Sequence, residues 1–142
     1  MLTDEQINDH WREANRSHAM DEREMLEMAA LAFWGDEIDD VCSIRWLETD
    51  RAIGYTHGDN QDHNGIDLEL VWNPLADDGD AFRLAVKLGI CFGPNFDGDM
   101  AVCFGREGRN ITEDFGDDPC AATRLAIIRA AAAIGQQMKE QT

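Results

Sequence analysis

Residues 117–138 read DDPCAATRLAIIRAAAAIGQQM, and this segment predicts a long C-terminal helix. Asp117 or Asp118 provides the N-cap, and Pro119 takes the first helical position, where a missing N–H costs nothing. The apolar side chains form one stripe and a second stripe beside it: Leu125, Ile128 and Ala132, then Ile127, Ala131 and Ile134. A helix that is apolar around much of its circumference is usually buried. We therefore expect this helix to be largely buried against a sheet.

Two more helices are predicted in the first part of the chain. The first covers roughly residues 4–15. Its apolar face is formed by four side chains: Leu2, Ile7, Trp11 and Ala14. The second covers about residues 20–34, with Met25 and Met28 on its apolar face. Methionine-rich faces serve adaptable interfaces as well as cores, and at helical spacing we interpret this one as core.

The middle of the chain changes to the period of strands. The predicted strands are residues 41–47, 52–55, 66–71, 90–93 and 101–106. Residues 66–71 alternate apolar with acidic side chains, so one face should pack and the other should meet water. A short helix over residues 81–88 follows, preceded by aspartates that suit its N-terminus. With no repeat or linker, we expect a single α/β (α+β) domain over residues 1–142.

The composition excludes several classes of protein. The chain has 142 residues and a mass of 15.9 kDa, a size that forms a core without disulfides or metal. Apolar residues make up 44% of it, too many for intrinsic disorder. No run approaches the roughly 18 apolar residues of a membrane span. The first residues lack the basic and apolar regions of a secretory signal, so we expect a cytoplasmic protein without a membrane partner.

The charge is strongly negative and unevenly distributed. Twelve Lys and Arg against 29 Asp and Glu give a net charge of −17, of which residues 1–80 carry −16 and residues 81–142 carry −1. We therefore expect a protein partner with a basic surface and no direct binding of nucleic acid. The acidic candidates for partner binding are Asp36, Glu37, Asp39, Asp40, Asp77, Asp78 and Asp80. Solvated loops and helix N-termini are the other explanation of such clusters.

One loop has the composition of a metal site. Its candidate ligands are His57, Asp59, Asp62 and His63. The run from Asn60 is also similar to the first half of an EF-hand loop, yet Val71 stands where that motif needs a bidentate Glu. Asn64-Gly65 favours a hairpin turn, because this pair adopts positive φ readily. A turn explains the same residues, so the sequence predicts neither a bound metal nor a cofactor.

The four cysteines do not form a zinc motif. Cys42, Cys91, Cys103 and Cys120 lack the close CxxC pairs that place two thiolates on one ion. Cys91 and Cys103 have apolar neighbours, where a free cysteine acts as a small hydrophobic residue. Without an export signal the thiols should stay reduced. We predict that they are unreactive core thiols.

Two segments together resemble a known family. They are Trp72–Ile90, WNPLADDGDAFRLAVKLGI, and Asp118–Ala131, DPCAATRLAIIRAA. This pattern resembles the phage ABA sandwich family of small phage and prophage proteins, over roughly residues 20–138, with residues 1–18 as an N-terminal helical extension. The resemblance implies a three-layer α-β-α sandwich, with a small, mainly antiparallel sheet and a long C-terminal helix. It also implies a phage or prophage origin, work in a bacterial cytoplasm, and no catalytic residues or cofactor.

The sequence favours binding over catalysis. It contains no nucleophile elbow, P-loop or HExxH motif. We predict a non-enzymatic phage accessory protein that binds a host or phage macromolecule through an acidic surface. The more specific version of this hypothesis is an inhibitor of a nucleic-acid-handling defence enzyme, of the anti-CRISPR or anti-restriction type. Two alternatives stay open: a structural homodimer joined by Trp11 and Trp34, and a metal-dependent hydrolase that uses the His57–His63 loop.

Overall fold

A computed structural model describes residues 20–35, 41–104 and 110–141. These residues form three helices and six strands. In chain order they are α2 (Glu22–Trp34), β1 (Val41–Leu47), β2 (Ala52–Gln61), β3 (Asp67–Trp72), α3 (Asp78–Leu88), β4 (Cys91–Pro94), β5 (Met100–Phe104), β6 (Asn110–Asp114) and α4 (Pro119–Glu140). The helical extension predicted at residues 1–18 lies outside the described residues.

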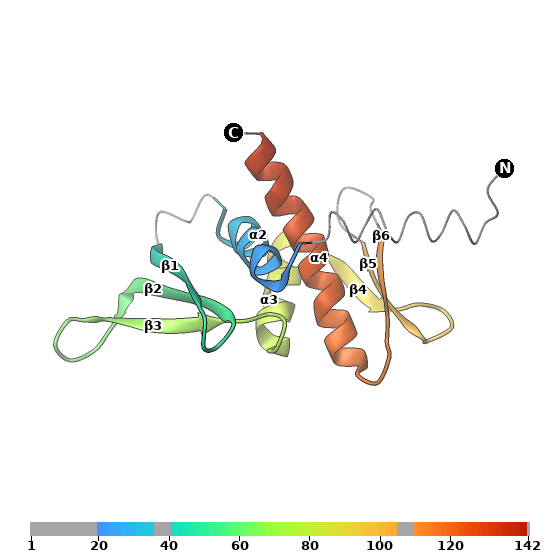
Figure 1. Ribbon diagram of the computed structural model, residues 1–142, viewed down its shortest axis with the longest axis horizontal. Coiled ribbons are helices and arrows are strands. Elements are labelled where there is room, and N and C mark those ends of the chain that lie inside the picture. Colours follow the sequence, from blue (N-terminus) through green and yellow to red (C-terminus); the bar gives the residue numbers. More distant parts are fainter. Residues whose placement is uncertain (1–19, 36–40, 105–109, 142) are drawn as a thin grey trace.

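The strands form two antiparallel sheets of three strands each, in the orders β1-β2-β3 and β4-β5-β6. The expected class, a mixed α/β fold with antiparallel strands and a long C-terminal helix, is confirmed. The arrangement of the layers differs from the expected α-β-α sandwich. In place of one sheet covered by helices on both sides, the helices lie between two sheets (Figure 1).

Helix α4 holds the two halves together. It packs on β5 and β6 on one side and on α2 and α3 on the other, while α2 contacts β2. Its buried residues are Ala122, Ala126, Ile127, Ile128, Ala130, Ala131, Ala132 and Gly135. The predicted burial of this helix is thus confirmed, because its apolar residues occupy more than one face. Although α4 has 22 residues, no helix in the described part of the chain combines the length and hydropathy of a membrane span.

Each described helix begins at an aspartate. The carboxylates of Asp21, Asp77 and Asp118 accept hydrogen bonds from backbone N–H groups three residues later, at 2.8, 2.8 and 3.1 Å. Pro119 follows the last of them, as the sequence predicts. These acids satisfy N–H groups that the first turn of a helix leaves unpaired. Part of the negative charge therefore serves helix initiation.

The closest approach in the core is between α2 and α4. Gly135 of α4 is buried, and a Cβ built on it would overlap the carbonyl oxygen of Met28 and lie 2.7 Å from its carbonyl carbon. Ala29 and Ala30 on α2 and Ala131 on α4 are also buried. Small side chains on both helices therefore let the two backbones touch, and a larger residue at position 135 would separate them.

An aromatic cluster joins α2 to the first sheet. The ring of Trp34 lies 5.1 Å from Tyr55 and 5.2 Å from Trp72, and Phe33 stacks on Trp72 at 5.5 Å. Trp34 is 7% exposed, so its proposed place in an exposed dimer patch is wrong, and Trp11 lies outside the described residues. Such pairs stabilise a core beyond the area that they bury.

Two strands differ from the sequence prediction. β2 continues to Gln61 instead of ending at Tyr55, because the chain stays paired with β3 through an irregular register after Thr56. β6 is not among the predicted strands. Its residues alternate between exposed and half-buried, and the inward positions are Ile111 and Glu113, so a carboxylate interrupts the apolar alternation that would mark the strand.

We expect Gly135→Ala to lower the free energy of unfolding by at least about 2 kcal/mol, even after the gain of about 1 kcal/mol in helix propensity. The reason is that the Met28 carbonyl group cannot move aside as a flexible side chain would. Urea denaturation measures the change. Gly93→Ala is the control, since a Cβ there meets nothing within 4 Å. Equal stability of the two variants would contradict the proposed backbone contact.

Candidate protein-binding surface

The acidic candidates fall into two groups. Four lie outside the described residues: Asp36, Glu37, Asp39 and Asp40. The other group surrounds the N-terminus of α3. Asp77 is its N-cap, and Asp80 accepts a hydrogen bond from the backbone N–H of Asn73 at 2.9 Å. Asp80 thereby ties the first turn of α3 to the end of β3, and it has a structural role.

Two arginines neutralise much of the charge of this second group. Nη2 of Arg83 lies 2.7 Å from Asp80 and 3.8 Å from Asp77. Nη1 of Arg124 lies 2.6 Å from Asp78, and its Nε donates to the carbonyl oxygen of Leu75 at 2.7 Å. The hydrogen bond from Arg83 to Asp80 raises the pKa of that guanidinium. These aspartates are engaged within the fold before any partner arrives.

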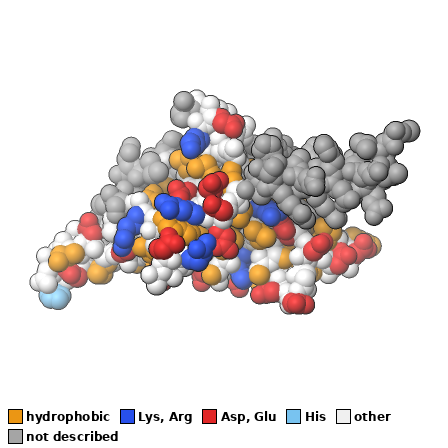
Figure 2. Space-filling model, viewed as in Figure 1, with side chains coloured by type: hydrophobic (Ala, Val, Ile, Leu, Met, Phe, Trp, Pro, Cys, Tyr) orange, Lys and Arg blue, Asp and Glu red, His pale blue; other side chains and the backbone are white. Residues whose placement is uncertain are grey.

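Other acids of the first eighty residues are paired as well. Arg45 donates two hydrogen bonds of 2.7 Å to Glu69, and they lower the pKa of that carboxyl. Two further pairs are Arg23 with Glu27 at 2.7 Å and Arg51 with Glu22 at 3.4 Å. Figure 2 shows Asp and Glu interspersed with Lys and Arg across the middle of the molecule. The described acids do not form a continuous negative surface on this face.

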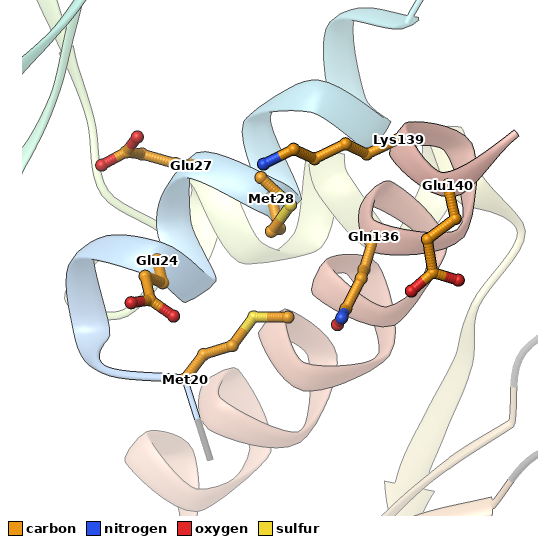
Figure 3. Close-up of a pocket in the computed structure, with 7 residues that line it drawn as sticks. All are labelled: Met20, Glu24, Glu27, Met28, Gln136, Lys139 and Glu140. Carbon is orange, nitrogen blue, oxygen red and sulfur yellow. The ribbon is translucent and has the colours of Figure 1, made fainter. Parts of the chain in front are cut away.

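A hollow of about 600 Å³ lies between α2 and the last turns of α4 (Figure 3). Its lining consists of two methionines, four charged residues and an amide: Met20, Met28, Glu24, Glu27, Lys139, Glu140 and Gln136. In Figure 3 the thioethers of Met20 and Met28 and the amide of Gln136 point into the space. The carboxylates lie toward its rims. The floor is therefore apolar and flexible, and the edge is charged.

A second hollow of about 500 Å³ adjoins the first. It shares Glu27, Met28 and Lys139 with it and extends between α2 and the first sheet. Leu31, Ile44 and Met138 add apolar lining there. We call the two hollows together the methionine groove, after Met20, Met28 and Met138. Methionine side chains are unbranched and polarisable, so they adapt to different apolar surfaces.

The rim of the methionine groove is negative. Glu24 and Glu140 have no ion-pair partner among the described residues, and Glu27 is paired only with the exposed Arg23. Lys139 has an interaction of its own. Unpaired carboxylates thus flank the apolar floor from both helices, an arrangement that attracts cationic side chains.

The four candidate metal ligands lie at the end of β2 and in the hairpin turn that follows it. The carboxylate of Asp62 accepts hydrogen bonds from the backbone N–H groups of Asn64 and Ile66, at 2.8 and 3.0 Å, and Gly65 has φ +79°. His57 Nδ1 lies 3.7 Å from Asp59 Oδ2, while His63 is exposed within the turn. In the described part of the chain no three His, Cys, Asp or Glu side chains come together as metal ligands. The predicted turn therefore accounts for Asp62 and His63, whereas His57 and Asp59 lie on β2.

Glu113 is an inward carboxylate that the sequence did not reveal. It lies on β6 beneath α4 and forms an ion pair with Arg129. Burial raises the pKa of Glu113, and the guanidinium of Arg129 opposes that rise. Burial, with Glu113 nearby, also raises the pKa of the Cys103 thiol to about 11. Cys103 is therefore the inert core thiol that the sequence predicts.

Two other thiols differ from the prediction. Cys91 and Cys120 are exposed, so their assignment to the core is wrong. Cys91 begins the edge strand β4, and Cys120 lies in the first turn of α4, where one side of each element faces solvent. The apolar neighbours of Cys91 in the sequence belong to both faces of a strand, and this hid its exposure.

The methionine groove combines residues that the sequence could not bring together. Met28 and Lys139 both line it, although more than a hundred positions separate them. The methionines of residues 20–34 were the one available signal, and helical spacing made them indistinguishable from core. Comparisons of the chain with protein-family models, curated proteins and solved structures find no match.

We expect Asp80→Ala to lower the free energy of unfolding by about 2 kcal/mol, because it leaves the Asn73 N–H and Arg83 without their charged acceptor. Thermal or urea denaturation measures this change. Asp117→Ala removes an exposed acid without a hydrogen bond in the described residues, and it should stay within about 0.5 kcal/mol. If both variants are as stable as the wild type, Asp80 has no structural role.

Glu113→Gln should change the dependence of stability on pH. Because the pKa of Glu113 is raised in the folded state, its contribution is full below the ordinary Glu pKa and is lost as pH rises through the raised value. The variant lacks this loss. The free energy of unfolding of the wild type minus that of Glu113→Gln should therefore fall as pH rises above 4.5, the ordinary pKa of Glu. A difference that stays constant would contradict the raised pKa.

Proposed function

We propose that this chain is a non-enzymatic protein-binding module, and that its methionine groove takes a basic amphipathic helix of a partner protein. The observation that supports the proposal is the groove itself, with a thioether floor and unpaired carboxylates at its rim. Helices that bind in grooves present apolar residues at helical spacing and set charged residues on either side. The groove matches both parts of such a ligand.

The floor suits an apolar helix face. Met20 and Met28 come from one side and Met138 from the other, and the two hollows together exceed the volume of a few large side chains. Flexible thioethers fill an irregular contact at low cost, and they accept more than one sequence. The groove is therefore suited to an apolar stripe and less to one rigid small molecule.

The rim suits basic side chains. Glu24 on α2 and Glu140 on α4 flank the floor, so a helix lying between them would meet carboxylates on both sides. The net charge of −17 adds long-range attraction for any cationic partner, and this attraction weakens as salt rises. Attraction speeds the encounter, and the groove holds the bound helix.

The partner class that we propose is a nucleic-acid-handling protein, because such proteins carry basic segments. A phage or prophage origin and inhibition of a host defence enzyme are the finer form of this proposal, and the resemblance to the phage ABA sandwich family supports the origin. Such an inhibitor would hold a basic segment of the defence enzyme in its groove and so compete with the nucleic acid that this segment binds.

Methionine methyl labelling tests the groove directly. The chain has six methionines, of which Met20, Met28 and Met138 line the groove and Met100 lies on β5. The probe is a synthetic peptide of about 18 Leu and Lys residues with Leu at helical spacing. Adding it to the ¹³C-methyl-labelled chain should shift the signals of the three groove methionines and leave that of Met100 unchanged.

A scrambled peptide of the same composition is the first control. It keeps the charge and loses the apolar face, so it should bind at least tenfold more weakly. Equal binding of the two peptides would mean that net charge alone attracts them. Unchanged signals of the three groove methionines would also contradict the proposal. This holds equally if the signals stay unchanged because another segment of the chain fills the groove.

Charge-reversed variants separate the rim from the net charge. Glu24→Lys/Glu140→Lys should weaken binding of the amphipathic peptide about tenfold, since two attractions become repulsions. Asp97→Lys/Asp117→Lys changes the net charge equally at two exposed positions that do not line the groove. Isothermal titration calorimetry should show a smaller loss for this pair. Identical losses would place the charge effect outside the groove.

A further inference from the structure

The apolar floor of the methionine groove is incompletely covered by the described residues. Five of its side chains are only half-buried: Met20, Met28, Leu31, Ile44 and Met138. In Figure 3 the thioethers of Met20 and Met28 point into the open space between the two helices. Apolar area that stays in contact with water is favourable to cover. The groove therefore has a free apolar surface that one more amphipathic element can bury.

The described chain begins at this groove. Met20 is the first described residue and lines the groove itself, and α2 begins two residues later, at Glu22. Residues 1–19 are therefore tethered at the mouth of the groove. A segment on a short tether has an effective concentration of about millimolar at its site, whereas a separate partner must reach the same site by diffusion.

The sequence of these residues predicts an amphipathic helix over roughly residues 4–15, which we call the N-terminal helix. Ile7, Trp11 and Ala14 follow one another at spacings of four and three residues, so they share one side of it. At about 100° per residue, three acids fall on the opposite side: Glu5, Asp9 and Glu13. The apolar side of this helix can therefore face the groove while these acids face solvent.

The connection to α2 determines where the N-terminal helix can pack. Residues 16–21 separate its predicted end from Glu22, and connections of about two to eight residues usually join antiparallel neighbours. Twelve residues of helix extend about 18 Å at 1.5 Å per residue. The groove follows α2 as far as Leu31, about 14 Å from Glu22 on the same scale. The lengths of the helix and the groove are therefore comparable.

We infer that the N-terminal helix occupies the methionine groove of the free protein, and that the basic partner helix binds by displacing it. The N-terminal helix lies antiparallel to α2 and buries Ile7 and Trp11 against the groove methionines. Its displacement by a partner rests on the proposed function. Its presence in the groove does not, because the tether and the apolar match are properties of this chain alone.

The N-terminal helix matches the floor of the groove but not its rim. Residues 4–15 carry four acids and one base, a net charge of −3, and the rim carries the carboxylates of Glu24 and Glu140. The tether holds the helix in place despite this repulsion. A resident helix lowers the apparent affinity of every partner by the same factor. Only a partner that matches both the floor and the basic requirement of the rim therefore binds well.

Methionine methyl signals of the full chain without peptide test whether the groove is occupied. Ile7→Ser/Trp11→Ser removes the apolar side of the N-terminal helix, so it should shift the signals of Met28 and Met138. The signal of Met100 on β5 should stay unchanged and so report an intact core.

Gln6→Ser/Asn8→Ser is the matched control, because it alters two polar residues of the same segment without changing the net charge. It should leave the signals of Met28 and Met138 as they are in the wild type. The inference is overturned if Ile7→Ser/Trp11→Ser leaves these two signals in place, or if the control shifts them equally.

Titration with the Leu and Lys peptide tests the displacement. Calorimetry should show Ile7→Ser/Trp11→Ser binding the peptide about tenfold more tightly than the wild type and the control do, since no helix has to leave the groove. Equal Kd values for the wild type and this variant would refute the displacement. If no form of the chain binds the peptide although the methionine signals shift, the proposed function fails and the N-terminal helix in the groove is supported.

Discussion

The contact between Gly135 and the carbonyl group of Met28 fixes the distance between α4 and α2. The other layers depend on it, because α2 carries the first sheet and α4 carries the second. Helices whose backbones touch at one point diverge on either side of it. The space that opens there is only partly filled by methionine side chains, and it is the methionine groove. One glycine thus determines both the packing of the core and the hollow between the two helices.

The acids of this chain have several different roles, which their number alone conceals. Asp21, Asp77 and Asp118 begin helices, and Asp80 ties α3 to the preceding strand. Others are held by arginines that lie far away in the sequence, as Asp78 is by Arg124. The negative charge that is left unpaired and can attract a partner is therefore smaller than the net charge suggests. For binding, the position of these unpaired carboxylates at the rim of the methionine groove matters more than the total charge.

Local signals in the sequence predicted the described helices and most strands well. Aspartate caps, Pro119 and the apolar stripes mark α3 and α4 because such signals act within one or two turns. The division into two sheets, the inward Glu113 and the exposed Cys91 depend on which strands pair, and this is decided by contacts between distant residues. The methionine groove could not be predicted from the sequence for the same reason, since its two walls come from opposite ends of the chain.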